Sequence, residues 1–350
     1  MKILFGVFDW GIGHATRDIP LITELLKTNE VHVISTGRAL RLLKDHFTSR
    51  CVYYDVPSVY PPYTRTRFFE LTFAFFLPKM IRSLQYARQK SQKIIGANFD
   101  RVISDCRYDV YDTPDNSFLI NHQLRFKTPF GAERVLEKLL ASRMNRYKYV
   151  IVPDFEQQSL SGRLSHDLRY VNEEKIRYIG ILSRLRKLDL AQDIEYFISV
   201  SGPEPQRTLL EQQMIDQSNQ LEGRVVIAGG IPESTATRSY GNRQFCSFLN
   251  AEQQENVMNR AKFIITRPGY TTIMELAELD KKKALLLPTP GQTEQEYLAG
   301  CYEEQGYFHS VSQYRLQLKK AIEDAKEFTG LCPLWKTQQS VREFMRVIDA

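Results

Sequence analysis

Thr266-Arg-Pro-Gly-Tyr-Thr-Thr-Ile-Met-Glu275 joins an apolar strand to a helix, and a second apolar strand follows that helix. Phe263 to Thr266 and Ala284 to Leu287 are short apolar runs of the kind that form buried strands, and Thr271 to Asp280 has helical spacing. A strand, a helix and a second strand in this order form one unit of a parallel α/β sheet. The polar residues between them are expected at the end of the sheet where nucleotides bind.

The loop before this helix has the features of a phosphate site. Gly269 lets the backbone approach a ligand closely. The amides of Tyr270, Thr271 and Thr272 are expected at the helix N-terminus, where unpaired N–H groups and the helix dipole favour a phosphate. Glu275, one turn into the helix, is placed to accept hydrogen bonds from a ribose diol. We therefore predict a nucleotide site.

A second polar loop, Pro288-Thr-Pro-Gly-Gln-Thr-Glu-Gln-Glu296, follows the next strand, and the two loops together resemble the carboxy-terminal domain of family 28 glycosyltransferases. This group includes the peptidoglycan N-acetylglucosaminyltransferase and the plastid galactolipid synthases. In those enzymes a Ser-Arg-x-Gly-x-x-Thr-x-x-Glu run binds the diphosphate and ribose of a UDP-sugar, and a later loop with paired polar residues contacts the sugar. The resemblance implies the following donor-binding residues: Arg267, Gly269, Tyr270, Thr271, Thr272, Glu275, Gln292, Gln295 and Glu296. Members that use UDP-GlcNAc have two glutamines where this chain has Gln295-Glu296, so the donor sugar stays open.

Length and composition fit a protein of two domains. The chain has 350 residues, of which 43% are hydrophobic, enough for two domains that each have a core. Met1 to Phe8 is apolar but reaches Asp9 too soon for a secretory signal, so we predict a first strand there. Five scattered cysteines argue against a disulfide framework or a zinc site: Cys51, Cys106, Cys246, Cys301 and Cys332. A cytoplasmic protein is expected, with peripheral attachment to the inner face of the plasma membrane as an alternative.

The net charge of +6 fits an anionic ligand, an anionic membrane surface or nucleic acid about equally well. No recognisable nucleic-acid motif accompanies this charge, and the basic residues are spread along the chain. We therefore predict no nucleic-acid partner.

Strands and helices alternate along both halves of the chain, which predicts an α/β fold with two doubly wound, Rossmann-like domains. Predicted strands of the first half are Ile3 to Phe8, Val31 to Ser35, Val52 to Asp55, Val102 to Asp105, Phe118 to Asn121 and Val150 to Pro153. Those of the second half are Tyr196 to Val200, Val225 to Ala228, Phe245 to Leu249, Phe263 to Thr266 and Leu285 to Leu287. The segment Arg177 to Leu182 is expected to be the junction. The resemblance implies a GT-B arrangement with two domains facing a cleft: residues 1–176 bind the acceptor, 183–330 bind the nucleotide-sugar, and 331–350 include a helix that packs back on the first domain.

No run of residues approaches the ~20 apolar residues that a membrane span requires. The most apolar segment is Phe68 to Leu77, which carries five phenylalanines and has basic residues on both sides. One interpretation is a core helix with polar ends. The other is insertion into a membrane interface or a groove for a hydrophobic acceptor, since the resembling enzymes act on lipid acceptors at this part of the first domain.

Gly11-Ile-Gly-His-Ala-Thr-Arg17 follows the first predicted strand, which raises the possibility of a dinucleotide site. Thr16 stands where that fingerprint has its third glycine or alanine, and the next strand ends without an acid, so NAD or FAD is not expected. In the resembling transferases this loop lies near the donor diphosphate and the acceptor. The resemblance implies acceptor-side roles for Gly11, Gly13 and Arg17.

Transfer of a sugar to a hydroxyl by direct displacement requires a base near neutral pKa, and His14 is our first candidate. Asp105, at the end of Ile103-Ser-Asp-Cys-Arg107, is the alternative, because open α/β sheets place their ligand-facing groups at strand ends. A lone His or Asp at a strand end is more often structural than catalytic. Three further residues at these strand ends are predicted on the acceptor side: Arg107, His122 and Gln123.

The leaving group of such a reaction is a nucleoside diphosphate, whose developing charge needs cations or aimed dipoles. Beside Arg267 and its helix, the loop Ser201 to Arg207 supplies Gly202 and Arg207. Further donor-site candidates, which could equally be turn glycines and core residues, are Gly229, Gly230, Phe248 and Leu249. No Asp-x-Asp pair follows a strand, so we predict no required metal or other cofactor, although Mg²⁺ remains compatible with the sequence.

These observations favour an inverting glycosyltransferase that moves a hexosyl or N-acetylhexosaminyl group from a nucleotide-sugar, expected to be a UDP-sugar, to a lipid-linked or other hydrophobic acceptor. Two alternatives share the architecture: a UDP-sugar 2-epimerase, and a protein that binds nucleotide-sugars without turnover.

Overall fold

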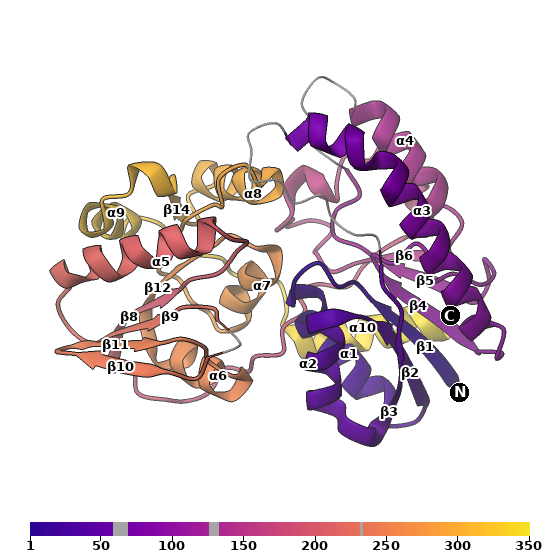
Figure 1. Ribbon diagram of the computed structural model, residues 1–350, viewed down its shortest axis with the longest axis horizontal. Helices are drawn as coiled ribbons and strands as arrows, with labels where there is room; N and C mark the ends of the chain where they lie inside the picture. The colour runs from indigo at the N-terminus through magenta and orange to yellow at the C-terminus, as the bar shows by residue number, and fades with distance from the viewer. Residues whose placement is uncertain (59–68, 126–132, 232–233) are drawn as a thin grey trace. The chain divides into compact units, whose positions relative to one another are not determined.

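The computed structural model describes residues 1–58, 69–125, 133–231 and 234–350, and gives backbone alone for residues 69–78, 80 and 81. The chain forms two compact units, one from Met1–Arg184 together with Leu334–Ala350, the other from Leu185–Pro333 (Figure 1). Each unit has a mostly parallel sheet flanked by helices, so the predicted α/β fold with two doubly wound domains is confirmed.

The sheet of the first unit is parallel, with strand order β3-β2-β1-β4-β5-β6-β7. The strands are β1 (Lys2–Val7), β2 (Glu30–Ser35), β3 (Cys51–Asp55), β4 (Arg101–Asp105), β5 (Ser117–Ile120), β6 (Tyr149–Val152) and β7 (Ile176–Tyr178). Val7 pairs with Asp105, and Asp105 pairs with Ile120, so β1, β4 and β5 end side by side. The loops that follow these three strands therefore leave the sheet at one place.

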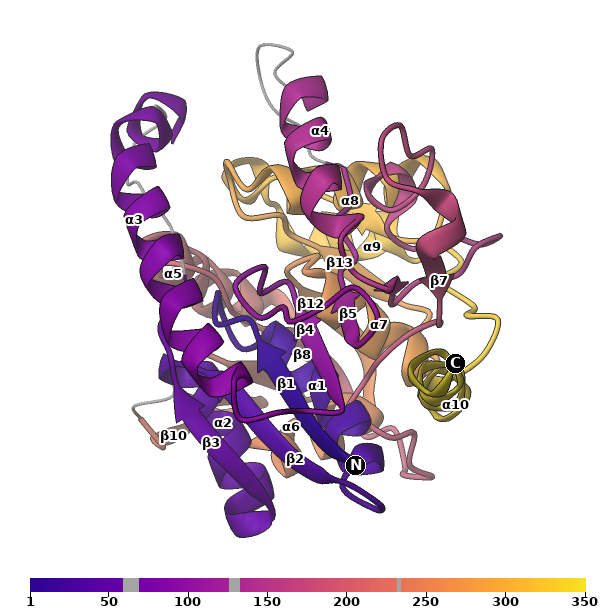
Figure 2. The same cartoon turned by 90° about the vertical axis from the view of Figure 1, so that its right-hand side faces the viewer.

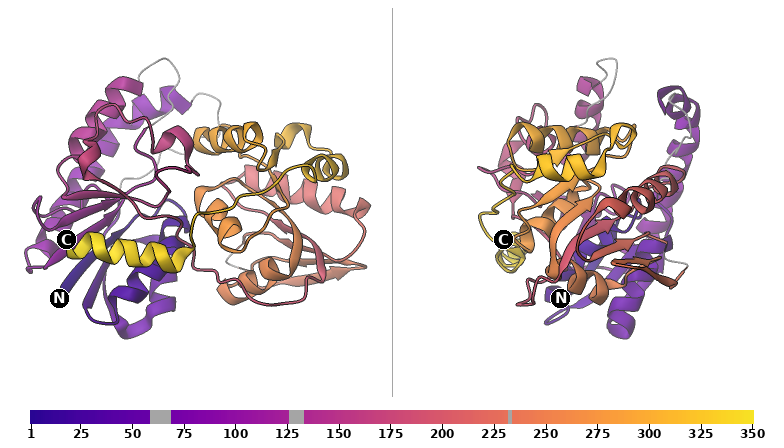
Figure 3. Two further views of the ribbon diagram at one scale, coloured as in Figure 1. Left: turned by 180° about the vertical axis from the view of Figure 1, so that it is seen from behind. Right: turned by 90° about the vertical axis from the view of Figure 1, so that its left-hand side faces the viewer.

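Helices cover both faces of this sheet (Figure 2). The helices are α1 (Gly13–Leu25), α2 (Gly37–Phe47), α3 (Phe69–Ile95), α4 (Glu133–Met144) and α10 (Thr337–Asp349). Helix α1 contacts both α2 and α10, so the last helix of the chain packs on the first unit (Figure 3). Ile95 of α3 packs in one apolar cluster with Leu4 and Val102 of the sheet. Met144 of α4 packs in another cluster with Leu119 and Val150 of the sheet.

The junction differs from the predicted one. Ile176–Tyr178 forms β7, which is hydrogen-bonded to β6, and the chain leaves the first unit after Arg184. A strand at the edge of the sheet therefore occupies the start of the segment that we expected to link the domains.

The sheet of the second unit has the order β10-β11-β9-β8-β12-β13-β14 and is parallel except for the β10–β11 pair. Its strands are β8 (Ile194–Ser199), β9 (Val225–Ala228), β10 (Thr237–Tyr240), β11 (Arg243–Cys246), β12 (Ala261–Thr266), β13 (Ala284–Leu286) and β14 (His309–Ser310). Its helices are α5 (Gln206–Gln217), α6 (Ala251–Arg260), α7 (Tyr270–Glu278), α8 (Thr293–Glu304) and α9 (Leu318–Ala325). One core cluster unites Leu210 and Met214 of α5 with Ile322 of α9 and the strands beneath them.

Strand β11 ends three residues before the predicted limit of Leu249. Asn250 forms a capping box with Gln253 at the start of α6, accepting from its backbone N–H at 2.9 Å. Residues 247–249 therefore connect a strand to a capped helix and cannot extend the strand.

Among the described residues, no helix is both long enough and apolar enough to cross a membrane. The predicted contact segment Phe68 to Leu77 lies outside the described side chains: Phe68 is not described, and residues 69–77 are described as backbone of α3.

Candidate active site

Four polar side chains meet where β1, β4 and β5 end. His14 and Arg17 lie one helical turn apart in the first turns of α1, so they point to the same side. Nδ1 of His14 lies 2.7 Å from Oδ2 of Asp105, and the guanidinium of Arg17 forms an ion pair with the same carboxylate. Nη1 of Arg17 lies 2.9 Å from Nδ1 of His122, which follows β5. The structure thus brings together four residues that the sequence placed on three separate loops.

The surroundings of Asp105 keep it ionised. Burial alone would raise the pKa of this fully buried carboxyl, but Arg17 and then His14 hold the pKa well below its usual range. Burial lowers the pKa of His14, and the carboxylate of Asp105 offsets that effect in part. His14 is consequently neutral at physiological pH, as a base must be before it accepts a proton.

The hydrogen bonds also bear on which ring nitrogens carry protons. Nδ1 of His14 lies 2.7 Å from Oδ2 of Asp105 and 2.9 Å from Nη2 of Arg17. An ionised carboxylate can only accept, so in the tautomer that bonds to Asp105 Nδ1 is the donor, and Nε2 then has the free lone pair. A guanidinium can only donate, so Nδ1 of His122 accepts from Arg17 and Nε2 of His122 carries the proton. The His14 side chain is 16% exposed, whereas Asp105 is fully buried. His14 can therefore reach a substrate while Asp105 orients it, an arrangement typical of a general base and its positioning carboxylate.

Two arginines predicted on the acceptor side have structural roles instead. Arg17 is buried and bonded to Asp105 and His122, so it organises the cluster without reaching solvent. Arg107 is also buried, and it donates to both carboxylate oxygens of Asp109 at 3.1 and 2.7 Å and to the carbonyl of Val56 at 2.9 Å.

The remaining acceptor-side candidates lie on the loops around His14. Gly11, with a φ of 83°, lies in the loop before α1, and Gly13 is the first residue of that helix. Gln123 follows His122 and is half-buried, with its backbone N–H bonded to Asn121. These placements are compatible with acceptor contacts but give no sign of a catalytic role.

Aromatic side chains that we did not predict flank His14. The ring of Phe8 meets the imidazole edge to face at 5.3 Å between centroids, and Trp10 lies 5.0 Å from Phe8. Trp10 and Ile12 are more than one-third exposed. An apolar surface thus adjoins the base, and the apolar start of the chain, which we interpreted as a strand alone, was the available signal.

His14, Asp105 and Cys106 each place a possible metal ligand within 4.8 Å of the others. The Asp105 oxygens are already occupied by a guanidinium and an imidazole N–H. A cation there would lie against Arg17, so the arrangement fits an ion-paired cluster better than a metal centre.

In the second unit, α7 begins directly after β12, and the predicted phosphate loop lies between them. A Cβ at Gly269 would meet only Thr272 Oγ1, at 3.9 Å among the described atoms, and its φ of −69° suits any residue. Among the described atoms there is therefore room for a further atom beside Gly269, at the start of α7. Thr271 is half-buried and Glu275 is buried one turn further on.

Arg267 forms hydrogen bonds to the segments around the start of α7. Its guanidinium, which is 2% exposed, donates to the carbonyl oxygens of Leu287 at 2.8 Å and Pro288 at 3.0 Å and to Oε1 of Gln313 at 2.6 Å. In the described part of the chain no carboxylate pairs with it, and burial lowers its pKa to about 10. Arg267 thus places an uncompensated positive charge beneath the loop, which favours an anion nearby.

Arg207, the other predicted cation, is already neutralised. It forms ion pairs with Glu204 and Glu211 and donates to the carbonyl of Gly229 at 2.9 Å. Gly230, at φ 68°, has a packing reason to be glycine, since a Cβ would lie 2.4 Å from the carbonyl oxygen of Val200.

The loop between β13 and α8 is held by its own polar residues. Gln295 is buried and accepts from the backbone N–H of Thr289 at 2.9 Å, while Glu296 accepts from that of Gly291 at 2.9 Å. Gln292 is exposed at the start of α8. Gln295 and Glu296, the paired residues expected to contact the sugar, therefore accept hydrogen bonds from the backbone of their own loop in this structure.

Thr289 is a polar residue in this loop that we did not predict. Its hydroxyl is buried and has no hydrogen-bond partner in the described parts of the chain. It faces Gly202, where a Cβ would lie 3.4 Å from the Thr289 oxygen and 4.0 Å from Nε of Arg267. Gly202, Thr289 and Arg267 thus enclose a space that a larger residue at 202 would reduce. Phe248 and Leu249, both half-buried, follow β11 in the same unit.

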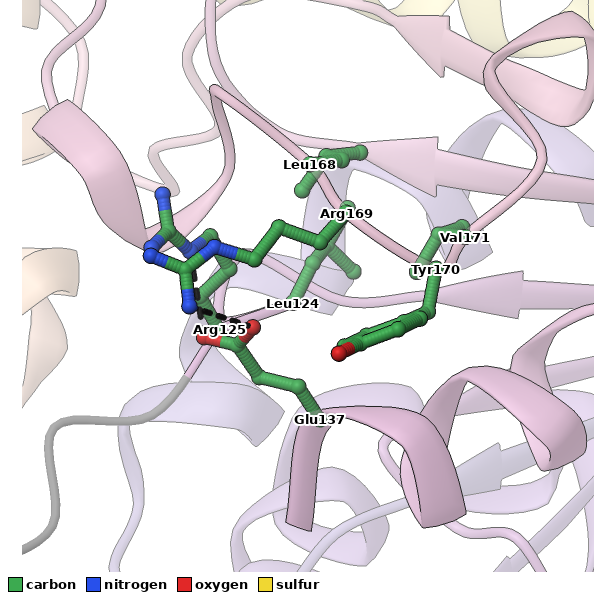
Figure 4. A pocket seen from close by; sticks show the side chains of 7 residues that line it. All are labelled: Leu124, Arg125, Glu137, Leu168, Arg169, Tyr170 and Val171. Atoms are coloured by element: carbon green, nitrogen blue, oxygen red, sulfur yellow. Dashed lines mark hydrogen bonds and ion pairs between the residues drawn. The ribbon is translucent and has the colours of Figure 1, made fainter. Parts of the chain in front are cut away.

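A small hollow in the first unit lies against α4 (Figure 4). Nε of Arg125 lies 3.1 Å from Oε1 of Glu137, and Arg169 lies 3.8 Å from the other carboxylate oxygen. The hollow has no room for a water-sized molecule, so we interpret these contacts as an anchor for α4.

Comparison with protein families gives two matches. Residues 204–331 match the glycosyltransferase family 28 C-terminal domain, and residues 1–60 match glycosyl transferase family 1. The chain is a glycosyltransferase with a family 28 carboxy-terminal domain. The matched regions of this glycosyltransferase include the loop of His14 and all predicted donor residues from Arg207 onward. The comparison with curated protein sequences gives no significant match.

Solved structures with the GT-B fold resemble the glycosyltransferase along its length. The glycotransferase of kitacinnamycin has a TM-score of 0.64 at 14% identity, covering 99% of this chain and 97% of its own. MurG of Acinetobacter baumannii has a TM-score of 0.56 at 13% identity, covering 100% and 95%. The spinosyn rhamnosyltransferase SpnG, complexed with thymidine diphosphate, has a TM-score of 0.60 at 12% identity, covering 100% and 95%. At these identities the likeness establishes the fold.

Proposed function

We propose that this glycosyltransferase transfers a sugar with inversion, with His14 as the general base. The observation that carries the proposal is the 2.7 Å contact between His14 and Asp105, which leaves Nε2 of His14 free to accept a proton. In this step Nε2 takes the proton of an acceptor hydroxyl while its oxygen bonds to the anomeric carbon. The bond from that carbon to the diphosphate oxygen breaks, and the nucleoside diphosphate leaves with the electron pair. A single displacement of this kind inverts the anomeric centre.

The donor is proposed to bind the second unit, with its diphosphate at the start of α7. Support comes from the open space at Gly269 and from the charge of Arg267, which has no carboxylate partner in the described region. Resemblance to family 28 favours a UDP-sugar, whereas SpnG was solved with thymidine diphosphate, so both nucleotides belong in the test. A helix N-terminus and a fixed guanidinium can stabilise the leaving diphosphate, and we propose that no metal ion is required. Activity that persists in EDTA would support this.

A hydrophobic acceptor fits the surroundings of the base. Phe8, Trp10 and Ile12 form an apolar surface beside His14, and two of them are partly exposed. A lipid-linked hydroxyl would combine contact with this surface and access to Nε2.

Contact with an anionic membrane is proposed through the outer face of α4. Val135 and Leu139, one turn apart, are 65% and 61% exposed. Three exposed cations surround them, Arg134, Lys138 and Arg143, none of which forms an ion pair within the described ranges. An apolar pair with a cationic border is typical of a helix that lies against anionic lipid. Such attachment would place the protein at the cytoplasmic membrane face.

The two alternatives explain the site less well. An epimerase needs several carboxylates around the sugar, whereas the cluster at His14 contains one ionised carboxylate, Asp105, which is fully buried. A protein that binds without turnover has no need of a neutral histidine held by a carboxylate.

The test combines binding and turnover. Thermal shifts are measured with UDP, thymidine diphosphate, UDP-glucose, UDP-galactose, UDP-GlcNAc, UDP-glucuronate and GDP-mannose, since a ligand of the folded state raises Tm. Release of free nucleoside diphosphate from the best donor is then followed with and without a lipid extract. Acceptor-dependent release supports the transferase; conversion of the sugar to its 2-epimer, or binding without release, supports an alternative.

A further inference from the structure

Asp18 is a carboxyl group buried beneath the active-site cluster. It follows Arg17 in α1, it is fully buried, and in the described part of the protein no donor group reaches either of its oxygens. Its carboxyl group interacts with that of Asp105. The reaction proposed above does not use it, and we did not predict it from the sequence.

Charge balance indicates which of the two carboxyls is ionised. Asp105 accepts from Arg17 and His14, whereas no donor reaches Asp18, and an ionised carboxylate without a donor is costly to bury. The charged and titratable groups that act on Asp18 are Arg17 of its own helix, Asp105 of β4 and Cys106, which follows that strand. Burial and then Asp105 raise the pKa of Asp18 well above its usual range, and Arg17, already paired, opposes this only in part.

We propose that Asp18 is a positioning residue that keeps its proton in the folded protein and presents a neutral carboxylic acid to Asp105. The cluster then holds one carboxylate, balanced by Arg17, and the hydroxyl of Asp18 is a third donor for that carboxylate beside Arg17 and His14. This constrains the orientation of Asp105, and through it the ring of His14. The effect on catalysis rests on the proposed function; the retained proton does not.

The retained proton is tested by stability, without any substrate. In the unfolded chain Asp18 loses its proton near pH 3.9, while the folded protein keeps it, so the contribution of Asp18 to wild-type stability falls as pH rises above about 4. Asp18→Asn carries no such proton. The unfolding equilibrium constant of the wild type, divided by that of Asp18→Asn, should therefore rise about tenfold for each pH unit. The rise should stop when the pH reaches the pKa of Asp18 in the folded protein.

Denaturant unfolding of wild type and Asp18→Asn from pH 4 to pH 8 measures this ratio, with Asp115→Asn, a change at an exposed aspartate, as the control. The control should follow wild type. Parallel curves for wild type and Asp18→Asn would overturn the proposal, because they would mean that Asp18 ionises alike in both states.

The positioning role is tested by kinetics. Asp18→Ala should lower kcat about tenfold, and Asp18→Asn, whose amide can still donate to Asp105, should recover most of that loss. The acid limb of kcat/KM should keep its midpoint in Asp18→Asn, because no charge beside His14 is lost. Equal kcat for the two variants, or an acid limb moved to lower pH in Asp18→Asn, would overturn the role. If no donor supports transfer at all, the proposed function fails while the stability test still decides the protonation of Asp18.

Discussion

Val7, the last residue of β1, is paired in register with Asp105, the last residue of β4. Parallel strands that end together send their loops out at one place, so the loop after Val7 passes Asp105 and brings His14 to 2.7 Å from its carboxylate. A slip of one residue would turn the Asp105 side chain to the other face of the sheet. The pair of His14 and Asp105, 91 positions apart, thus depends on the register of the sheet.

Replacement of His14 tests the base directly. We expect His14→Ala to lower kcat by ~100-fold to ~10,000-fold, the usual contribution of a general base. The Kd for the nucleotide-sugar should stay near the wild-type value, because the donor loops lie in the second unit. Steady-state kinetics and calorimetric titration measure the two quantities, and His46→Ala, which changes an exposed histidine of α2, is the control. A variant with normal kcat would exclude His14 as the base.

Replacement of Asp105 tests the positioning carboxylate through pH dependence. The carboxylate raises the pKa of His14 against the effect of burial, so Asp105→Asn should lower that pKa further. A base acts when deprotonated, so the acid limb of kcat/KM should move to lower pH while kcat falls by ~100-fold or more.

Loss of the Asp105 charge also leaves Arg17 without its ion-pair partner, which destabilises the fold. Asp109→Asn is the matched control, because it likewise removes the carboxylate of a buried arginine pair, that of Arg107. It should cost stability without moving the acid limb. If the acid limb of kcat/KM stays in place in Asp105→Asn, as it should in Asp109→Asn, the group that titrates in that limb is not His14.

The outer face of α4 gives a prediction about membranes. The double change Val135→Ser and Leu139→Ser should reduce flotation with liposomes that contain anionic lipid, because both side chains are exposed and their burial in the interface is lost. Lys138→Glu should weaken binding in proportion to the anionic lipid content. The pair Leu209→Ser and Tyr240→Ser, on exposed apolar residues of the second unit, serves as the control. Equal flotation of all variants would exclude this face.

Apart from the end of β11, sequence reasoning located most strand ends well, because a strand end depends on local pattern. Asp105 and His122 follow apolar runs, and the sheet brings their loops together with that of His14. The partners of an arginine depend instead on long-range packing. Arg17 meets a carboxylate 88 positions away, whereas Arg107 finds one two positions away.

Two other features had no local signal. Strand β10 was missed because all four of its residues are exposed, so it shows no apolar alternation. Asp18 lies between Arg17 and an apolar run in a helix, a place where an aspartate is usually solvated, and its burial follows from the packing of α1 on the sheet.

Thr289 offers a sharp test of the donor site, because its buried hydroxyl has no partner in the described regions and faces Gly202 beside Arg267. Thr289→Val keeps the shape and removes the hydroxyl. A hydroxyl that bonds to no protein group contributes nothing to stability, so Tm without ligand should stay the same or rise slightly. If the hydroxyl bonds to a donor phosphate, the Kd for the nucleoside diphosphate should rise by about 5-fold to 10-fold, which corresponds to about 1 kcal/mol. Thr289→Ser, which retains the hydroxyl, should bind as wild type does. A Kd that is unchanged in Thr289→Val, with an unchanged Tm, would show that the space beside Gly202 lies outside the donor site.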